Sequence, residues 1–240
     1  RSGLALPPGV LKPVVIDLET ATVGKSALTT IGKKWVMAIA GLVWCLFLLA
    51  HMLGNLTFFG GPDMYNGYSE HLISLGPILI VLEAGLVFFL LAHTVCAISL
   101  TLENRAARPV RYAEFTGKGG KTVASRTMIY SGLLIVFFMV VHLLNFKFAE
   151  HGTTAAGLLD LHGAVTDHFL YLPYAAGYII AVSIVGLHAS HALQSSIRTL
   201  GVNGERSFPT VNRISRLFGL LLSIGYASIP VFVLFAKGGA

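Results

Sequence analysis

The sequence predicts an all-α, polytopic membrane protein with five transmembrane helices in one bundle, and three observations support this fold class. Hydrophobic residues make up 55% of the 240 residues and charged residues only 12%, about half the charged fraction of a soluble domain. Five apolar stretches reach the roughly 20 residues that a helix needs to cross a bilayer. Lysine and arginine are concentrated in alternate connections between these stretches, as membrane topology requires.

The predicted spans follow one another with no room for a soluble domain between them. Each should be a helix, because lipid offers the backbone of an isolated span no other hydrogen-bond partner. Residues 1–33 are expected to form a cytoplasmic N-terminal segment; three prolines disfavour an early helix there, and no long apolar core resembles a signal peptide. Residues 34–240 should form the membrane domain. The spans cover about residues 34–59, 77–102, 127–149, 171–197 and 214–236.

Charge indicates how the spans are oriented. The residues that bound the five spans on one common side are, in order, Lys34, Asn104, Arg126, Arg198 and Arg213. The second connection carries six Lys and Arg residues and the fourth carries four, whereas the first has none. The positive-inside rule therefore predicts a protein of the inner (cytoplasmic) membrane, with the N-terminus in the cytoplasm and the C-terminus outside. The net charge of +6 follows this topology, so no nucleic-acid partner is expected.

Cysteine usage excludes several kinds of metal centre. The two cysteines, Cys45 and Cys96, lie inside apolar runs, and the sequence contains no CxxC pair. This pattern disfavours an iron–sulfur cluster, a c-type haem attachment and a structural zinc site. The sequence also has no dinucleotide-binding motif, so the chain is not expected to oxidise a metabolite by itself.

Histidines inside the spans are the most informative residues. His51, His93, His142 and His188 lie in four different spans, one in each, and the fifth span has none. A polar side chain inside a membrane is costly and generally functional. A single histidine could simply hydrogen-bond a neighbouring helix, but one histidine in each of four spans favours a shared site.

The depth of these histidines predicts how they pair. His51 and His142 lie 17 and 16 residues from the cytoplasmic boundary of their spans, whereas His93 and His188 lie 11 and 10 residues from it. These counts correspond to heights of about 25 Å and about 16 Å. Two histidines at each of two levels suit two haems, each held by two imidazoles between facing helices. A zinc ion would need three or four ligands at one level.

His191 is a second candidate ligand in the fourth span. It lies three residues after His188 and so on nearly the same helix face. Its height would be about 4–5 Å closer to the cytoplasm, which fits the level of His93 less well. We therefore favour His188 as the ligand and expect His191 near a haem propionate or the cytoplasmic surface.

Two glycines repeat the spacing of the outer histidines. Gly41 lies ten residues before His51, and Gly132 lies ten residues before His142. Such glycines could make room for the edge of the inner porphyrin, or could serve ordinary close packing of helices. Both interpretations stay open at this point.

Several short motifs carry a family resemblance that covers essentially the whole chain. They are TIGKK at 30–34, HMLGNL at 51–56 with GGPDMYN at 60–66, NRAARP at 104–109 and LHASHALQSSIRTLG at 187–201. With one histidine in each of four spans, the chain resembles the cytochrome b membrane-anchor subunit of succinate dehydrogenases and fumarate reductases, in its single-subunit, five-helix, two-haem form. These enzymes serve the respiratory chain and the tricarboxylic acid cycle.

The resemblance implies a function in electron transport. The four histidines would bind two haem b groups, with the first histidine of LHASH as the ligand. The chain would dock an iron–sulfur subunit and a flavoprotein subunit on the cytoplasmic side and exchange electrons with a membrane quinone. Two-haem anchors of this family usually use menaquinone. The dicarboxylate site would lie on the partner subunits, and a higher oligomer is left open.

Cationic side chains near the cytoplasmic boundary are candidates for the inner haem propionates. They are Lys33, Lys34, Arg126 and Arg198. The basic connections as a whole would also suit lipid phosphates and a negatively charged docking partner.

Glu83 is the candidate catalytic residue for proton exchange with the quinone. Some related anchors use a glutamate near the start of the second helix, where this chain offers Glu70 in the connection and Glu83 in the span. Glu83 should lie about 31 Å above the cytoplasmic boundary, just outside the outer haem. Alternatively, its carboxyl reaches the interface and hydrogen-bonds a tyrosine or serine of the first connection. The other titratable residues of this side are Asp63, His71, Glu150, His151, Asp160, His162, Asp167 and His168.

Other functions fit the sequence less well. The cytochrome b anchor of a hydrogenase or formate dehydrogenase would share haems and quinone, but would place its ligands differently and lack the NRAARP connection. A bc-complex cytochrome b carries two histidines on each of two helices and is excluded. A proton-coupled transporter would be expected to show broken helices, and none is evident.

Overall fold

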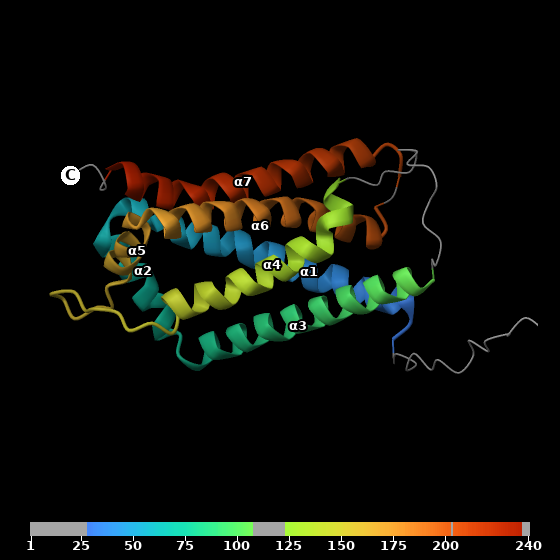
Figure 1. The fold of residues 1–240 in the computed structure, drawn as a ribbon. Coiled ribbons are helices and arrows are strands. Elements are labelled where there is room, and N and C mark those ends of the chain that lie inside the picture. The colour runs from blue at the N-terminus through green and yellow to red at the C-terminus, as the bar shows by residue number, and fades with distance from the viewer. Residues whose placement is uncertain (1–27, 108–122, 203, 237–240) are drawn as a thin grey trace, which may run out of the picture.

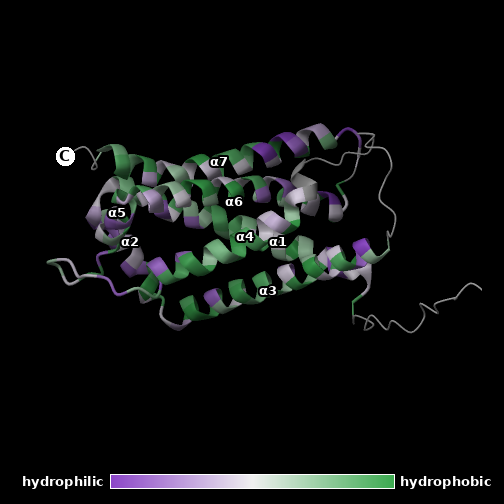
Figure 2. Ribbon diagram, viewed as in Figure 1, coloured by the Kyte–Doolittle hydropathy of each residue, from purple (hydrophilic) through white to green (hydrophobic). Residues whose placement is uncertain are grey.

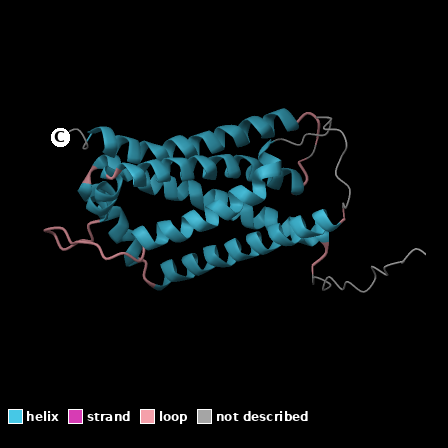
Figure 3. Cartoon of the chain, in the orientation of Figure 1, coloured by secondary structure: helices cyan, strands magenta, loops and turns pink. Residues whose placement is uncertain are grey.

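The computed structural model describes residues 28–107, 123–202 and 204–236. Within these ranges the chain consists of helices and connections, with no strand (Figure 3). The helices are α1 (Thr30–Leu56), the 3₁₀ turn η2 (Thr57–Gly60), α2 (Pro62–Ser74), α3 (Pro77–Ala106), α4 (Val123–Phe146), α5 (Leu161–Leu170), α6 (Leu172–Thr199) and α7 (Phe208–Ala236). Five of them are long and apolar enough to cross a membrane, which confirms the predicted fold class of a polytopic, all-α membrane protein.

The helix bounds differ from the sequence expectation in several places. Helix α1 begins at Thr30, inside the segment that was expected to precede the membrane domain, because the Thr29 hydroxyl accepts a hydrogen bond from Gly32 N–H at 3.1 Å and caps the helix. Helix α7 begins at Phe208, six residues before its expected start. Helices α2 and α5 occupy stretches that were expected to be connections without structure of their own.

Four long helices form a ring, and the fifth packs on its outside (Figure 1). The contacts run from α1 to α3, from α3 to α4, from α4 to α6 and from α6 back to α1. Helix α7 lies against α6 and α1. The pairs α1–α4 and α3–α6 are therefore the diagonals of a four-helix bundle.

The contact between α6 and α7 is the closest in the bundle because glycines face each other across it. A side-chain carbon built on Gly186 would collide with the carbonyl oxygen of Gly219, and the reverse collision occurs at Gly219. Small residues let membrane helices approach with their backbones nearly in contact. Helix α7 is thereby held on the outside of the ring, where it carries no histidine.

The surface has the character expected of a protein embedded in lipid. Large apolar side chains are exposed along the long helices, among them Phe88, Phe137 and Leu187, each about two-thirds exposed. Figure 2 shows apolar residues along the middle of the helices and hydrophilic residues gathered towards their ends. Apolar exposure on this scale is untypical of a water-soluble monomer. The chain is a multi-pass membrane protein.

Helices α2 and α5 cover one end of the bundle, which we call the capped end; the opposite end is called the open end (Figure 1). The two short helices are joined through Asn66, which is almost fully buried. Its amide donates to the Asp160 carboxylate at 3.1 Å, and its carbonyl oxygen accepts from His162 N–H at 2.9 Å. Asp160 also caps α5, accepting from Gly163 N–H at 2.9 Å.

The hydrogen bond from Gly163 N–H, followed by the one from Asn66, holds the pKa of Asp160 below its ordinary value. Because the folded-state pKa is depressed, this carboxylate stabilises the capped end above its ordinary pKa. The contribution is lost as the pH falls through the depressed value.

Candidate functional site

The intramembrane histidines meet in two pairs, with the partners that their depth in the sequence predicted. The rings of His51 and His142 have centres 5.9 Å apart. The rings of His93 and His188 have centres 6.4 Å apart. No group of three or more His, Cys, Asp or Glu side chains is placed to hold a metal ion within the described ranges.

The two pairs lie at two levels of the bundle. His51 lies five residues before the end of α1, and His142 lies four residues before the end of α4. His93 and His188 each lie sixteen residues after the start of their helix. Those starts and ends all belong to the capped end, so the levels are separated by roughly 17 Å along the bundle axis. We call them the capped-end pair and the open-end pair.

Each pair spans one diagonal of the ring. His51 and His142 come from α1 and α4, whereas His93 and His188 come from α3 and α6. Adjacent helices contact each other around the ring, so side chains from opposite helices can meet only by reaching across its interior. All four imidazoles therefore point into the interior of the bundle.

Hydrogen bonds from neighbouring helices hold the open-end pair. Nδ1 of His93 lies 3.1 Å from the carbonyl oxygen of Met37 on α1. Nδ1 of His188 lies 2.9 Å from the hydroxyl oxygen of Ser131 on α4. Each open-end histidine thus forms a hydrogen bond with a residue of α1 or α4, the two helices that carry the capped-end histidines.

Gly41 and Gly132 lie against the same two rings. A side-chain carbon on Gly41 would come within 3.6 Å of the His93 ring, and one on Gly132 would come within 3.4 Å of the His188 ring. These are ordinary contact distances, so alanine would meet the imidazoles without a collision. Any side chain at these positions would touch the imidazoles, and both interpretations of the two glycines stay open.

The capped-end pair has a different environment. The His51 ring stacks on Phe47 with centres 5.2 Å apart, and the Asn55 amide nitrogen lies 3.3–3.4 Å from both of its ring nitrogens. That amide already donates to the His51 carbonyl oxygen at 2.8 Å. Nδ1 of His142 is buried without a hydrogen-bond partner. An orphaned polar atom in an apolar interior is costly, so this ring is the more dependent of the two on a further ligand.

The spacing within both pairs fits a metal ion with two axial imidazoles. Metal–imidazole bonds are about 2 Å long, which sets the centres of two such rings about 6 Å apart. The spacings of 5.9 Å and 6.4 Å agree with this value. Because each level offers only two protein ligands, a metal whose remaining ligands come from a macrocycle suits the site, and haem iron meets this requirement.

An apolar pocket of about 300 Å³ opens between α4 and α6 beside the capped-end pair. Phe138 and Tyr178 line it, and both rings contact His142, with centres 5.9 Å and 6.1 Å away. The Tyr178 hydroxyl accepts a hydrogen bond from the Asn145 amide at 3.1 Å. The pocket is therefore an apolar opening next to His142, and the Tyr178 hydroxyl is a polar group among its lining residues.

Lys33 has a partner that sequence reasoning missed. The residue is 4% exposed, and its ammonium group forms an ion pair with Glu103 and donates to the Ser99 hydroxyl at 2.8 Å. This pair links α1 to α3 at the open end. Lys33 was expected at a haem propionate, but in this structure its charge is engaged by Glu103. Lys34 is exposed.

His191 and Arg198, both expected near the propionates, line one polar pocket on α6. The guanidinium carbon of Arg198 lies 5.1 Å from the centre of the Phe208 ring, which turns this side chain towards α7. His191 takes no part in the ring contact between His93 and His188, in agreement with His188 as the paired residue. Arg126 lies in α4, but its side chain falls outside the described part of the chain.

Glu83 is paired with a residue that was not considered as its partner. It forms an ion pair with Lys147, and the two side chains are 41% and 42% exposed. Glu83 lies on α3, and Lys147 directly follows α4. The alternative partner, a tyrosine or serine of the first connection, is replaced by this lysine. The carboxylate is thus neutralised at the capped end on the flank of α4, the helix that carries His142.

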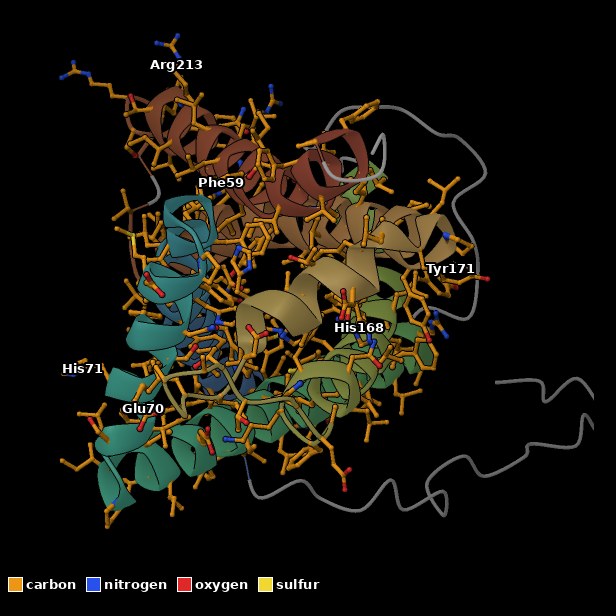
Figure 4. All side chains as sticks on the ribbon, turned by 90° about the vertical axis from the view of Figure 1, so that its left-hand side faces the viewer. Phe59, Glu70, His71, His168, Tyr171 and Arg213 are labelled. Atoms are coloured by element: carbon orange, nitrogen blue, oxygen red, sulfur yellow. The ribbon has the colours of Figure 1, made fainter. Side chains whose placement is uncertain are left out.

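The remaining titratable residues of the capped end divide into peripheral and central ones. Figure 4 shows Glu70 and His71 at the edge of the bundle and His168 nearer its axis. The His168 ring contacts Phe146 with centres 5.1 Å apart, and Phe146 in turn contacts His142 at 5.4 Å. His168 is therefore connected to His142 through one intervening ring, that of Phe146. Its place at the end of α5 could have singled it out only if that helix had been recognised.

Comparison of the chain with known protein families, curated proteins and solved structures found no match.

Proposed function

We propose that this chain is a two-haem cytochrome b membrane anchor of the succinate dehydrogenase and fumarate reductase type, which carries electrons between an iron–sulfur partner subunit and a membrane quinone. The observation that carries the proposal is the pair of His–His contacts at two levels on the two diagonals of the bundle. Haem b supplies reversible one-electron chemistry at each level. The chain itself is a subunit of the enzyme and holds no dicarboxylate site.

The residues of the chain would bind, orient and shield these groups. His51 with His142, and His93 with His188, would supply the axial ligands. The surrounding apolar helices exclude water, which keeps the redox centres in a medium of low dielectric constant and protects them from side reactions. His191 and Arg198 would meet the propionates of the open-end haem, where a cation at the membrane boundary offsets the propionate charge.

Orientation follows from the distribution of cations. The helix ends that flank the basic connections, Ala106, Val123, Thr199 and Phe208, belong to the open end, so the positive-inside rule predicts that this end faces the cytoplasm and the capped end the outside. The iron–sulfur subunit, with its flavoprotein partner, would dock on the open end. His93 and His188 would hold the haem on the side of the iron–sulfur subunit, and His51 and His142 the haem on the side of the quinone. A quinone, menaquinone by family resemblance, would react at the capped end.

The absorption spectrum of the purified protein tests the proposal directly. We expect b-type bands on reduction and two haems per chain by pyridine haemochrome assay, since each level offers one pair of imidazoles. A protein that carries no haem after expression with ample haem supply contradicts the proposal. If both haems are present, the subunits that copurify separate this anchor from that of a hydrogenase or formate dehydrogenase.

Replacing Glu83 by glutamine tests its part in quinone chemistry. Glutamine keeps the shape of the side chain but cannot exchange a proton, so quinone-linked turnover should fall about 100-fold. Both haem spectra and the activity of the assembled enzyme with an artificial dye should stay unchanged. Glu70→Gln is the matched control, because Glu70 is exposed at the periphery of the capped end and should leave turnover intact. Unchanged turnover in Glu83→Gln would remove Glu83 from the quinone site and direct attention to Glu70, His71 and the pocket beside His142.

A further inference from the structure

The hydrogen bonds of Ser131 favour one tautomer of His188. The hydroxyl group of Ser131 lies 3.1 Å from the carbonyl oxygen of Met128 and 2.9 Å from Nδ1 of His188. A carbonyl oxygen can only accept, so the single hydroxyl proton is donated to Met128. The oxygen of Ser131 must then accept from His188, which places the ring proton on Nδ1. With the opposite tautomer, one of these two bonds would be lost.

The same logic applies to His93. Its Nδ1 faces the carbonyl oxygen of Met37 at 3.1 Å, which is also an acceptor only. Nδ1 therefore carries the proton here too. In both open-end histidines Nε2 is left with its lone pair, which is the atom that can bind a metal.

Among the described residues, no acceptor oxygen forms a side-chain hydrogen bond with Nδ1 of either capped-end histidine. Nδ1 of His142 has no hydrogen-bond partner, and the group nearest the ring nitrogens of His51 is the amide nitrogen of Asn55, which is a donor. The two levels of the bundle thus differ in how their imidazoles are held, although both consist of one pair of rings.

We propose that Ser131, together with the Met37 carbonyl group, is a positioning residue that holds the open-end imidazoles in the Nδ1–H tautomer and tunes the haem bound between them. The inference rests on the proposed function for the identity of the bound group. A histidine ligand that donates its second N–H to an acceptor is a stronger base and is fixed in orientation. Stronger donation favours the ferric form, so Ser131 lowers the midpoint potential of the open-end haem.

Ser131→Ala tests this role in the full chain with its haems. The variant should bind the open-end haem about tenfold more weakly. Its midpoint potential should move upward, while the capped-end haem keeps its potential and spectrum. The open-end haem is identified as the component that disappears in His188→Ala. In the haem-free chain in lipid bilayers, ¹⁵N chemical shifts should show the proton of His188 on Nδ1, and Ser131→Ala should weaken that preference.

Two further variants separate the hydrogen bond from packing. Ser131→Thr keeps the hydroxyl group and should restore the wild-type potential. Ser228→Ala removes a similar bond, from a serine hydroxyl to a carbonyl oxygen three residues earlier, on the histidine-free helix α7, and should change neither haem. The proposal is overturned if Ser131→Ala leaves the tautomer and the potential unchanged, or if Ser131→Thr is as defective as Ser131→Ala. Absence of haem from the wild-type chain would instead overturn the proposed function, and the ¹⁵N measurement would decide the role of Ser131 separately.

Discussion

Replacing His142 by alanine is expected to halve the haem content, from two haems per chain to one, and to remove the same spectral component as His51→Ala. The two rings form one contact, 5.9 Å between centres, so either substitution would leave the proposed haem with one histidine in place of two. His93→Ala and His188→Ala should both remove the other component, because these rings form the second contact at 6.4 Å. Pyridine haemochrome assays and low-temperature reduced spectra of the four variants measure the effect.

Double variants test which histidines share a haem, and not only how many haems the chain binds. Within a pair, the double variant should lose no more haem than either single variant, because both residues serve one site. Across pairs, the double variant should lose both haems. His71→Ala is the control, since His71 is exposed at the periphery of the capped end. A chain that lacks His51 but retains both haems would disprove the pairing.

Removing the charge of Glu103 is expected to destabilise the protein more than removing the charge of Glu83. The Lys33 side chain is 5% exposed, so Glu103→Gln would leave a buried ammonium group without its counter-charge. Breaking a fully buried ion pair is costly, and the 33% exposure of the Glu103 side chain reduces that cost through solvent screening. The free energy of unfolding in detergent, measured at fixed haem occupancy, reports the loss.

The chain contains a matched control for this prediction. The ion pair of Glu83 and Lys147 also joins α3 to the region of α4, but both side chains are about two-fifths exposed. Glu83→Gln should therefore cost less than about 1 kcal/mol. Replacing both residues of the buried pair with apolar ones, as in Lys33→Met with Glu103→Leu, should recover most of the stability. Equal losses in Glu103→Gln and Glu83→Gln would show that burial of Lys33 contributes nothing.

The spans could be predicted from the sequence because the bilayer imposes a length and a composition that each helix satisfies by itself. The short helices could not, although their signals were present. Pro62 follows Gly61 at the start of α2, and Asp160 precedes α5 as a capping residue. Both helices are polar enough to look like connections, and they are stabilised by contacts with each other through Asn66. Contacts between segments that are distant in the sequence produce no hydrophobic periodicity from which either helix could be predicted.

The candidate site, like the fold, could be predicted from the sequence only in part. The division of the histidines into two levels could be counted along the chain, because the rise per residue of a helix is constant. The counted separation of about 9 Å was too small, since the helices do not begin and end at the assumed boundary charges. The ion-pair partners of Lys33 and Glu83 and the hydrogen-bond partner of His188 could not be deduced, since each depends on which helices are neighbours and how each is rotated about its axis. Glu103 lies 70 residues after Lys33 in the sequence, and Ser131 lies 57 residues before His188.

The sequence by itself determined that this is a membrane protein of five spans, that four of the spans carry one interior histidine each, and that these histidines fall into two levels. These properties follow from the length, hydropathy and helical rise of single segments. Only the tertiary structure decided that the pairs occupy the two diagonals of a four-helix ring, that α7 lies outside it, and that Ser131 and Met37 hold one pair but not the other. Those features depend on side-chain packing between helices, where glycine contacts such as Gly186 with Gly219 select the neighbours.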